Sequence, residues 1–144
     1  MLVSQILRSK ADDGVLTVRE DAVVGEAARI LSERRVGSLV VSWDGRHVTG
    51  ILSERDIVRE IGRRGAGCLS EPVAALMTRE VVTCTRGDSA DGVLAAMTEG
   101  RFRHLPVVEA GELVGLISIG DVVKARLAEL SMEKDALEGM IKGF

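Results

Sequence analysis

Short apolar runs alternate along the chain with segments in which apolar residues recur every three or four positions. Runs typical of buried strands lie at residues 15–18, 38–41 and 48–52, and again at 81–85, 105–108 and 113–117. Between the first and second run of each half the apolar spacing is helical, and a further helical pattern follows the third run. The pattern therefore predicts the order β-α-β-β-α twice, which is an α/β fold.

The two halves of the chain are copies of each other. Residues 17–45 align with residues 83–111, and after the loss of one residue the alignment continues through a shared motif, Gly-x-x-Ser-x-x-Asp, at residues 50–56 and 115–121. A unit of about sixty residues has little core of its own, so we expect the two copies to pack against each other.

Each copy also begins with a similar apolar segment, "VSQIL" at Val3 and "VAALM" at Val73, which predicts a lead helix. We predict a first repeat at residues 1–66, a second repeat at 67–130 and a helical tail at 131–144. The stretch "GRRGAGCLSEP" between the copies is rich in glycine and ends in proline, which predicts a linker. It is not a phosphate-binding loop, because no Lys-Ser/Thr follows its glycines.

The composition limits the function classes. The net charge is −3, and the chain has one Trp, two Phe and no Tyr. Nucleic-acid binding is not expected, because it requires a basic face or aromatic stacking platforms. No apolar run is long enough for a membrane span, and the first residues do not resemble a signal peptide. The two cysteines, Cys68 and Cys84, are too few for a disulfide framework, so we expect a reducing, cytoplasmic location. They also lack metal-ligand spacing, so we expect no metal site.

Four arginines cluster between residues 55 and 64, from the end of the first motif onward, and acidic residues lie among them. A solvated helix face is the favoured interpretation of this cluster, with a polyanion site as the alternative. The arginines are Arg55, Arg59, Arg63 and Arg64.

The repeated motif places a serine three residues before an aspartate, Ser53 with Asp56 and Ser118 with Asp121, where a helical pattern begins. Such a pair forms a capping box, in which each side chain accepts a backbone N–H of the other residue. The same helix N-terminus attracts phosphate, and a carboxylate can accept from both hydroxyls of a ribose. The motif alone leaves both interpretations open, and one does not exclude the other.

The repeats, with "VGSLVV" and "RFRHLPVV" before "GILSERD" and "GLISIGD", resemble a tandem pair of CBS domains over about residues 1–130. The resemblance implies two β-α-β-β-α repeats packed as a pseudo-two-fold pair, with two clefts between them. Members of this family commonly bind adenosine-containing molecules in such clefts, including AMP, ADP, ATP, NAD and S-adenosylmethionine. The resemblance therefore implies a nucleotide ligand at Ser53, Asp56, Ser118 and Asp121, and no catalytic cofactor.

In such modules basic residues before the second strand of a repeat often contact phosphate. This favours Arg103 and His104, with Arg101 next, and makes the second repeat the better-equipped half. A surface loop with a satisfied histidine is the alternative. The first repeat carries Gly37 and Ser38 at the aligned positions, so we expect the two clefts to differ.

In related modules a cleft often combines the Ser-x-x-Asp of one copy with strand residues of the other. The resemblance thus pairs Thr17 with Asp121 and Thr83 with Asp56, with both threonines near the adenine. Threonines that face solvent from a strand are the alternative.

The helical pattern of the second motif continues into the tail. Its apolar residues recur at steps of four and three, with Lys134 in the same line, at Val123, Leu127, Leu130, Leu137 and Ile141. A partner helix from a second subunit would cover this line, so we expect a homodimer. Packing of the tail on its own module is the alternative.

No catalytic constellation is present in the sequence, since neither His47 nor His104 has a plausible nucleophile or base partner. We therefore expect a regulatory sensor of adenine nucleotides, not an enzyme, that signals its ligand state to an unidentified partner protein. A structural or interaction module without ligand is one alternative. A small nucleotide-acting enzyme with Asp56 or Asp121 as its base is the other.

Overall fold

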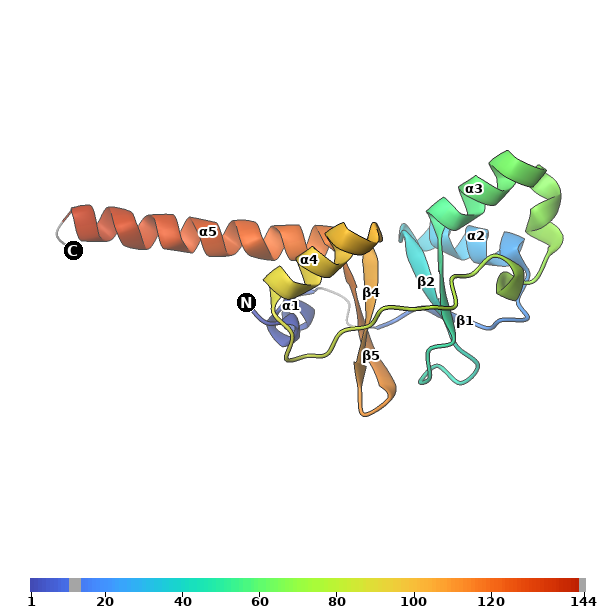
Figure 1. Cartoon of the computed structure of the whole chain (residues 1–144), viewed down its shortest axis with the longest axis horizontal. Coiled ribbons are helices and arrows are strands. Elements are labelled where there is room, and N and C mark those ends of the chain that lie inside the picture. Colours follow the sequence, from blue (N-terminus) through green and yellow to red (C-terminus); the bar gives the residue numbers. More distant parts are fainter. Residues whose placement is uncertain (11–13, 143–144) are drawn as a thin grey trace.

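The computed structural model describes residues 1–10 and 14–142 and shows two α/β repeats side by side, with one long helix projecting from the second (Figure 1). The first repeat contains β1 Thr17–Val18, α2 Val24–Arg34, β2 Ser38–Val41, β3 Gly50–Ser53 and α3 Glu54–Arg64. The second contains α4 Ala90–Gly100, β4 His104–Glu109, β5 Glu112–Ser118 and α5 Ile119–Ile141. Helix α1 Val3–Ser9 opens the chain, and the 3-10 helices η1 Ala66–Ser70 and η2 Val73–Ala75 follow α3.

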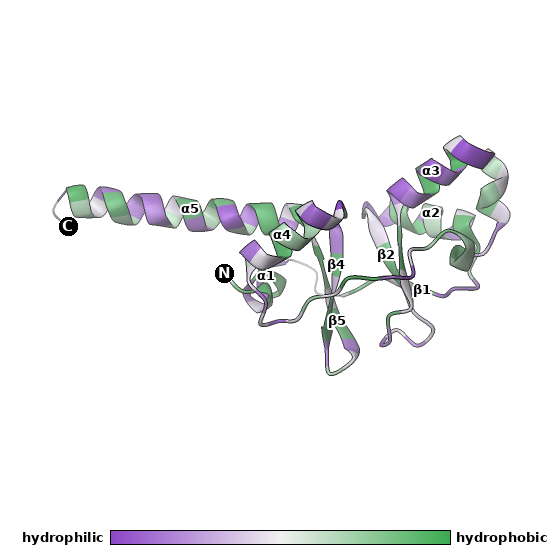
Figure 2. Cartoon of the chain, in the orientation of Figure 1, coloured by the Kyte–Doolittle hydropathy of each residue, from purple (hydrophilic) through white to green (hydrophobic). Residues whose placement is uncertain are grey.

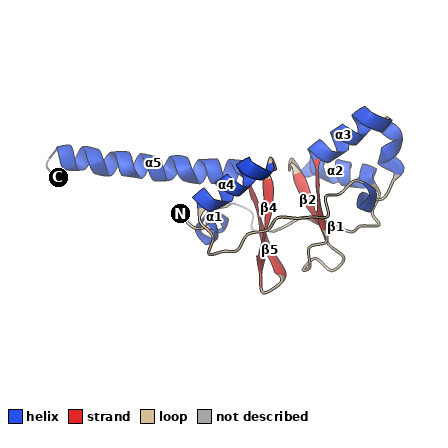
Figure 3. Cartoon of the chain, in the orientation of Figure 1, coloured by secondary structure: helices blue, strands red, loops and turns tan. Residues whose placement is uncertain are grey.

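The strands lie in the middle of the molecule and the helices lie outside them (Figure 3). In the first sheet β2 lies between β1, which is parallel to it, and β3, which is antiparallel. In the second sheet β4 and β5 are antiparallel, with an irregularity between Val107 and Val108. The predicted α/β architecture of two repeats and a C-terminal helix is therefore confirmed.

The strand predicted at residues 81–85 is wrong in its extent. Only Cys84 pairs with the second sheet, through a parallel bridge to Val107. Its N–H donates to the carbonyl of Pro106 at 3.0 Å, and its own carbonyl accepts from Val108 at 2.8 Å. The strand stops there because the N–H of Thr85 donates to the carboxylate of Asp88 at 2.8 Å, which turns the chain away from β4.

Each hydrophobic core is completed by the lead segment of the other repeat. Val3 and Ile6 of α1 are buried in the core of the second repeat, beside the strand residues Leu105 and Ile117. The segment that leads into the second repeat is buried in the core of the first, at Cys68, Val73, Leu76 and Met77. The two repeats are therefore interlocked by an exchange of lead segments, which chain order alone does not predict.

This exchange gives a physical reason for the glycine in each motif. A Cβ atom on Gly50 would lie 2.7 Å from Sδ of Met77 and 3.0 Å from the carbonyl oxygen of Thr78. A Cβ atom on Gly115 would lie 2.8 Å from Cδ2 of Leu7. Gly50 at the start of β3 and Gly115 in the middle of β5 therefore leave the space through which the exchanged lead segments pass.

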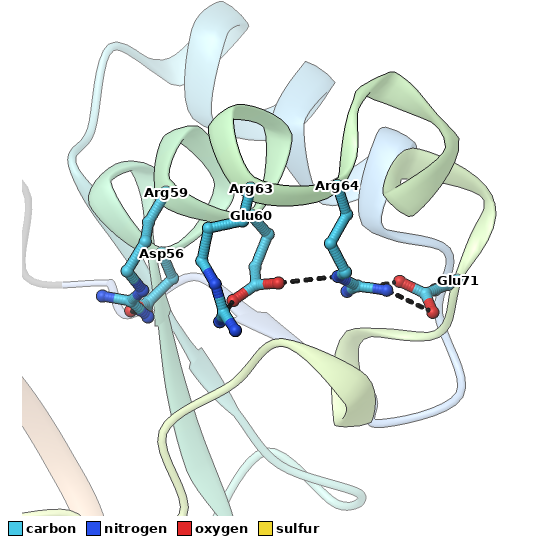
Figure 4. Close-up of polar contacts among 6 residues, drawn as sticks. All are labelled: Asp56, Arg59, Glu60, Arg63, Arg64 and Glu71. Carbon is cyan, nitrogen blue, oxygen red and sulfur yellow. Dashed lines mark hydrogen bonds and ion pairs between the residues drawn. The ribbon is translucent and has the colours of Figure 1, made fainter.

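The glycine-rich stretch at residues 62–72 is not the linker that its composition predicts. Helix α3 continues to Arg64, and η1 follows after Gly65, whose φ of 83° lies in the left-handed region that favours glycine. Cys68 within η1 is only 3% exposed. The guanidinium of Arg64 bonds Glu60 at 2.8 Å and Glu71 at 2.7 Å, and so ties α3 to the chain beyond η1 (Figure 4).

Three arginines of this region, Arg59, Arg63 and Arg64, are paired with acidic side chains, as expected for a solvated helix face. Arg59 bonds Asp56, and Arg63 bonds Glu60, within the same helix (Figure 4). Their side chains are more than half exposed. Arg63 and Arg64 therefore belong to a paired helix surface, whereas Arg55 and Arg59 also line a cleft between the repeats.

The prediction that the helix of the second motif continues into the tail is confirmed, because α5 runs without interruption from Ile119 to Ile141. Hydrophilic and hydrophobic residues alternate along its whole length (Figure 2). In the part of the chain that the structure describes, no helix combines the length and apolar character needed to span a membrane.

Candidate functional site

Two clefts lie between the repeats. We name them by their motif aspartates. The Asp121 cleft has a volume of about 600 Å³ and joins the start of α5 to the segment before β1, residues 14–16. The Asp56 cleft has a volume of about 470 Å³ and joins the start of α3 to residues 80–82, ahead of the second sheet. Each cleft thus combines the motif of one repeat with the incoming chain of the other, and each is within the usual range for a small-molecule site.

Both motifs form a complete capping box. The N–H of Asp56 donates to Oγ of Ser53 at 3.1 Å, and the N–H of Ser53 donates to Oδ2 of Asp56 at 2.9 Å. Ser118 and Asp121 repeat both bonds at the same distances. The capping interpretation is therefore confirmed as local structure. It orients each carboxylate at a helix N-terminus and leaves the helix dipole directed into a cleft.

The two aspartates differ in the acceptor capacity that they offer a ligand. Asp56 has a side chain only 9% exposed, and Arg59 donates to its second oxygen, Oδ1, at 2.8 Å. The Asp121 side chain is 23% exposed, and both of its partners bond Oδ2, namely the Ser118 N–H and Nζ of Lys10 at 2.9 Å. Among the described residues nothing bonds Oδ1 of Asp121, so this oxygen is open to a hydroxyl group from the cleft.

Burial by itself would favour the neutral form of Asp121. The Ser118 N–H and the Lys10 ammonium outweigh that effect and hold the pKa of the Asp121 carboxyl below its ordinary value. The side chain is therefore an anion at neutral pH, which is the form that accepts two hydroxyl hydrogens.

The basic loop lies in a different cleft from the one we expected. Arg101 and Arg103 line the Asp56 cleft, whereas we had assigned them to the same half as Asp121. The reason is the strand register. His104 pairs with Ser118, and the carbonyl of Arg103 accepts the N–H of Ile119, so the backbone caps α5 while both side chains extend into the opposite cleft.

The cations of the Asp121 cleft were missed by the sequence analysis. They are Lys10, Arg35 and Lys124. The repeat alignment carried a signal for two of them, since Arg35 aligns with Arg101 and Lys124 aligns with Arg59. Lys10 gave no such signal, because Glu80 is its counterpart in the other lead segment and lines the other cleft.

The two threonines do not belong to the cleft walls. The wall of the Asp121 cleft includes Val15 and Leu16 but not Thr17, and that of the Asp56 cleft includes Val81 and Val82 but not Thr83. Thr17 is instead the first residue of β1 and pairs with Val40. The structure thus brings together the expected pairs of segments, with each threonine one position beyond the wall.

Gly37, Ser38 and His104 line both clefts and form a shared wall between them. Burial lowers the pKa of His104, against the attraction of Asp121 and Glu54, so the ring is neutral at pH 7. The hydroxyl of Ser38 is 2% exposed as a residue and has no hydrogen-bond partner in the described part of the chain. A buried hydroxyl without a partner is unusual in a folded protein.

The described residues contain no cluster of three or more His, Cys, Asp or Glu that could hold a metal ion. Cys68 and Cys84 are buried free thiols, and burial together with Asp88 raises the pKa of Cys84 to about 12. A thiol in that state is a poor nucleophile at neutral pH.

Comparison with known proteins places this architecture in a family. The CBS domain family matches residues 3–63 and 73–128. The CBS domain-containing protein CBSX3, mitochondrial, of Arabidopsis thaliana is 34% identical over 148 residues, which cover 98% of this chain and 72% of the relative.

Two solved structures share the fold along most of their length. The CBS-domain containing protein ATU1752 from Agrobacterium tumefaciens is 45% identical with a TM-score of 0.83, and the match covers 88% of this chain and 99% of that one. The CBS domain protein PAE2072 from Pyrobaculum aerophilum, solved as a complex with AMP, is 28% identical with a TM-score of 0.77, covering 92% of this chain and 99% of that one. The chain therefore belongs to the CBS-domain family, as a tandem pair of CBS domains.

Proposed function

We propose that this CBS pair is a regulatory module that binds an adenosine-containing phosphate ligand, such as AMP, ADP, ATP or NAD, in its inter-repeat clefts. One observation carries the proposal: the Asp121 cleft brings an ionised carboxylate with an open oxygen, a helix N-terminus and three cations around one cavity. These are complementary to ribose hydroxyls and phosphate. The AMP complex of the relative PAE2072 supports adenosine as the nucleoside.

In this proposal Oδ1 of Asp121 accepts from the ribose hydroxyls, and the start of α5 and Arg35 face the phosphate. The backbone N–H groups of the first turn and the helix dipole stabilise the negative charge. Val15 and Leu16 offer an apolar surface for the base. The Asp56 cleft can hold a second ligand, with Arg101 and Arg103 as its phosphate contacts.

Signalling follows from the position of the clefts between the repeats. A ligand that fits one relative arrangement of the repeats better than another shifts the population toward that arrangement. A partner protein would bind the two arrangements of the repeats differently, and the module itself would perform no reaction. The cytoplasmic location expected from the sequence remains a prediction, and the Arabidopsis relative is named as mitochondrial.

Calorimetric titration of the full chain with AMP, ATP, NAD and adenosine, and with CMP as the control, tests the proposal. Asp121→Asn keeps the cap, because an amide oxygen still accepts the Ser118 N–H, but it loses the charge and the second acceptor. We expect about a ten- to hundredfold loss of AMP affinity, the scale of a hydrogen bond to a charged group. Asp56→Asn reports in the same way on the other cleft.

Phosphate contacts are tested with a matched pair of adjacent arginines. Arg35→Ala removes a cation from the Asp121 cleft and should weaken AMP more than adenosine, whereas Arg34→Ala, which does not line the cleft, should change neither. Arg103→Ala should affect only the Asp56 cleft. If no adenine compound binds below millimolar concentration, the module acts without ligand and the interaction-module alternative is correct. Release of a product from ATP or NAD would instead support an enzyme.

A further inference from the structure

One face of α5 is not covered by any of the residues that the structure describes. Val122 and Ala125 are buried against the body of the second repeat, and Arg126 bonds Asp91 of α4 at 2.9 Å. The opposite face carries a line of residues that we call the outer seam. Its members are Val123, Leu127, Leu130, Lys134, Leu137 and Ile141, of which Leu127, Leu137 and Ile141 are 62%, 59% and 85% exposed.

Most of the outer seam lies on the part of α5 that projects beyond the second repeat (Figure 1). In Figure 1 most of the helix projects away from both repeats, with no other element beside it. A projecting stretch of this length is only marginally stable as a helix in water by itself. Its seam residues alternate by four and three positions, which is the spacing of the a and d positions of a two-stranded coiled coil. The occupant that the seam fits is therefore another helix with the same spacing.

We propose that α5 pairs with α5 of a second copy of this chain, and that the two helices run antiparallel. In a parallel pair, Lys134 would meet the partner's Lys134 in the middle of the seam. Glu133 would also face the partner's Glu138 twice, once on each side. Like charges at such positions oppose pairing, so the charge pattern disfavours the parallel dimer.

In the antiparallel pair, the charge pattern is complementary. Leu127 lies opposite the partner's Leu137, and Leu130 lies opposite the partner's Lys134, whose stem packs while its ammonium extends to water. On one side of the seam Lys124 faces the partner's Glu138, and the symmetry repeats this contact. The like-charged contact that remains is the one between Glu133 and the partner's Glu133 near the two-fold axis.

The antiparallel pair also brings the second copy to the ligand site. Lys124 lines the Asp121 cleft as well as flanking the outer seam. The end of the partner's α5 would therefore lie at the rim of that cleft, while the two modules stand at opposite ends of the paired helices.

Cysteine cross-linking distinguishes the two orientations. Leu127→Cys and Leu137→Cys are made in separate full chains that differ in tag size, and each is oxidised alone and as a refolded mixture. We expect disulfide-linked dimers of the mixed kind only, whereas linkage within either variant alone would establish the parallel pair and overturn the proposal. Wild-type protein, whose two cysteines are buried, is the control and should remain unlinked.

A charge exchange tests the flanking contact by sedimentation. Lys124→Glu and Glu138→Lys should each raise the dimer dissociation constant by about fivefold, and the double variant should return it close to the wild-type value. Two single losses without recovery in the double variant would overturn the Lys124–Glu138 contact. A wild-type monomer at tens of micromolar would overturn the dimer itself.

Discussion

Nζ of Lys10, just beyond the end of α1, lies 2.9 Å from Oδ2 of Asp121 in the first turn of α5. The same Nζ donates to the carbonyl of Leu116 at 2.8 Å. One side chain from the start of the chain therefore joins the exchanged lead helix to the candidate ligand site of the second repeat. We therefore expect ligand binding at that site to be coupled to the packing of α1 through this contact.

We predict that Lys10→Met lowers the free energy of unfolding at pH 7 by about 0.5 kcal/mol, the scale of a partly exposed ion pair. The folded-state pKa of Asp121 is depressed, so its contribution is present above the ordinary carboxyl pKa of about 3.9 and is lost as the pH falls through the folded-state value. The free energies of unfolding of wild type and variant in urea should therefore converge as the pH falls below the depressed folded-state pKa of Asp121. Lys124→Met, in the same cleft but without a bond to Asp121, should show no such convergence.

The motif glycines provide a matched comparison between the repeats. Gly50→Ala would place its Cβ atom 3.0 Å from a backbone oxygen, that of Thr78, whereas Gly115→Ala would meet the end of the flexible Leu7 side chain. We expect Gly50→Ala to cost about 1–3 kcal/mol of stability and Gly115→Ala clearly less. Chemical denaturation of both variants measures the difference, and equal costs would contradict the close approach to Thr78.

The exchange of lead segments predicts that the repeats unfold together. Fragments 1–67 and 68–144 each lack a segment of their own core, since α1 belongs to the second repeat and the residues around Val73 belong to the first. Neither fragment should melt cooperatively alone. Ile6→Ala in the full chain should lower stability by about 2–4 kcal/mol within a single transition. Two separate calorimetric transitions, or a folded 68–144 fragment, would show that the exchange is dispensable.

His104 predicts a dependence of stability on pH. Burial is the main cause that lowers its folded-state pKa, and the positive charges of Lys10 and Arg103 lower it further. The negative charges of Asp121 and Glu54 act in the opposite direction but do not outweigh these effects. Its contribution is therefore present above the ordinary histidine pKa of about 6.5 and is lost as the pH falls toward the folded-state value. Between pH 7 and pH 5 the melting temperature of wild type should fall more steeply than that of His104→Gln. His47→Gln, at an exposed position, is the control, and a slope unchanged by His104→Gln would contradict this role.

Several features of the site could be predicted from the sequence because they are local. In each motif the serine lies three residues before the aspartate, in Ser53 with Asp56 and in Ser118 with Asp121. At the start of a helix, backbone geometry brings two residues with this spacing into hydrogen-bonding contact. The same holds for the order of strands and helices, since hydrophobic period depends on neighbouring positions along the chain.

The grouping of side chains into clefts could not be predicted in this way. Arg103 belongs with Asp56 and not with Asp121, because the pairing of His104 with Ser118 turns the loop toward the other repeat. Lys10 reaches Asp121 only because α1 crosses to the second core. Both contacts depend on packing between distant segments.

The sequence by itself determined the repeat, the α/β order, the capped motif helices and the exposed seam of α5, because each of these depends on the spacing of residues along the chain. The tertiary structure alone decided which lead segment completes which core, which cations surround each aspartate, and that Ser38 and His104 form one wall shared by two clefts. The physical reason is that these relationships arise when the two repeats bury apolar surface against each other's chain, and aligned positions in a duplicated sequence do not specify which copy supplies a partner.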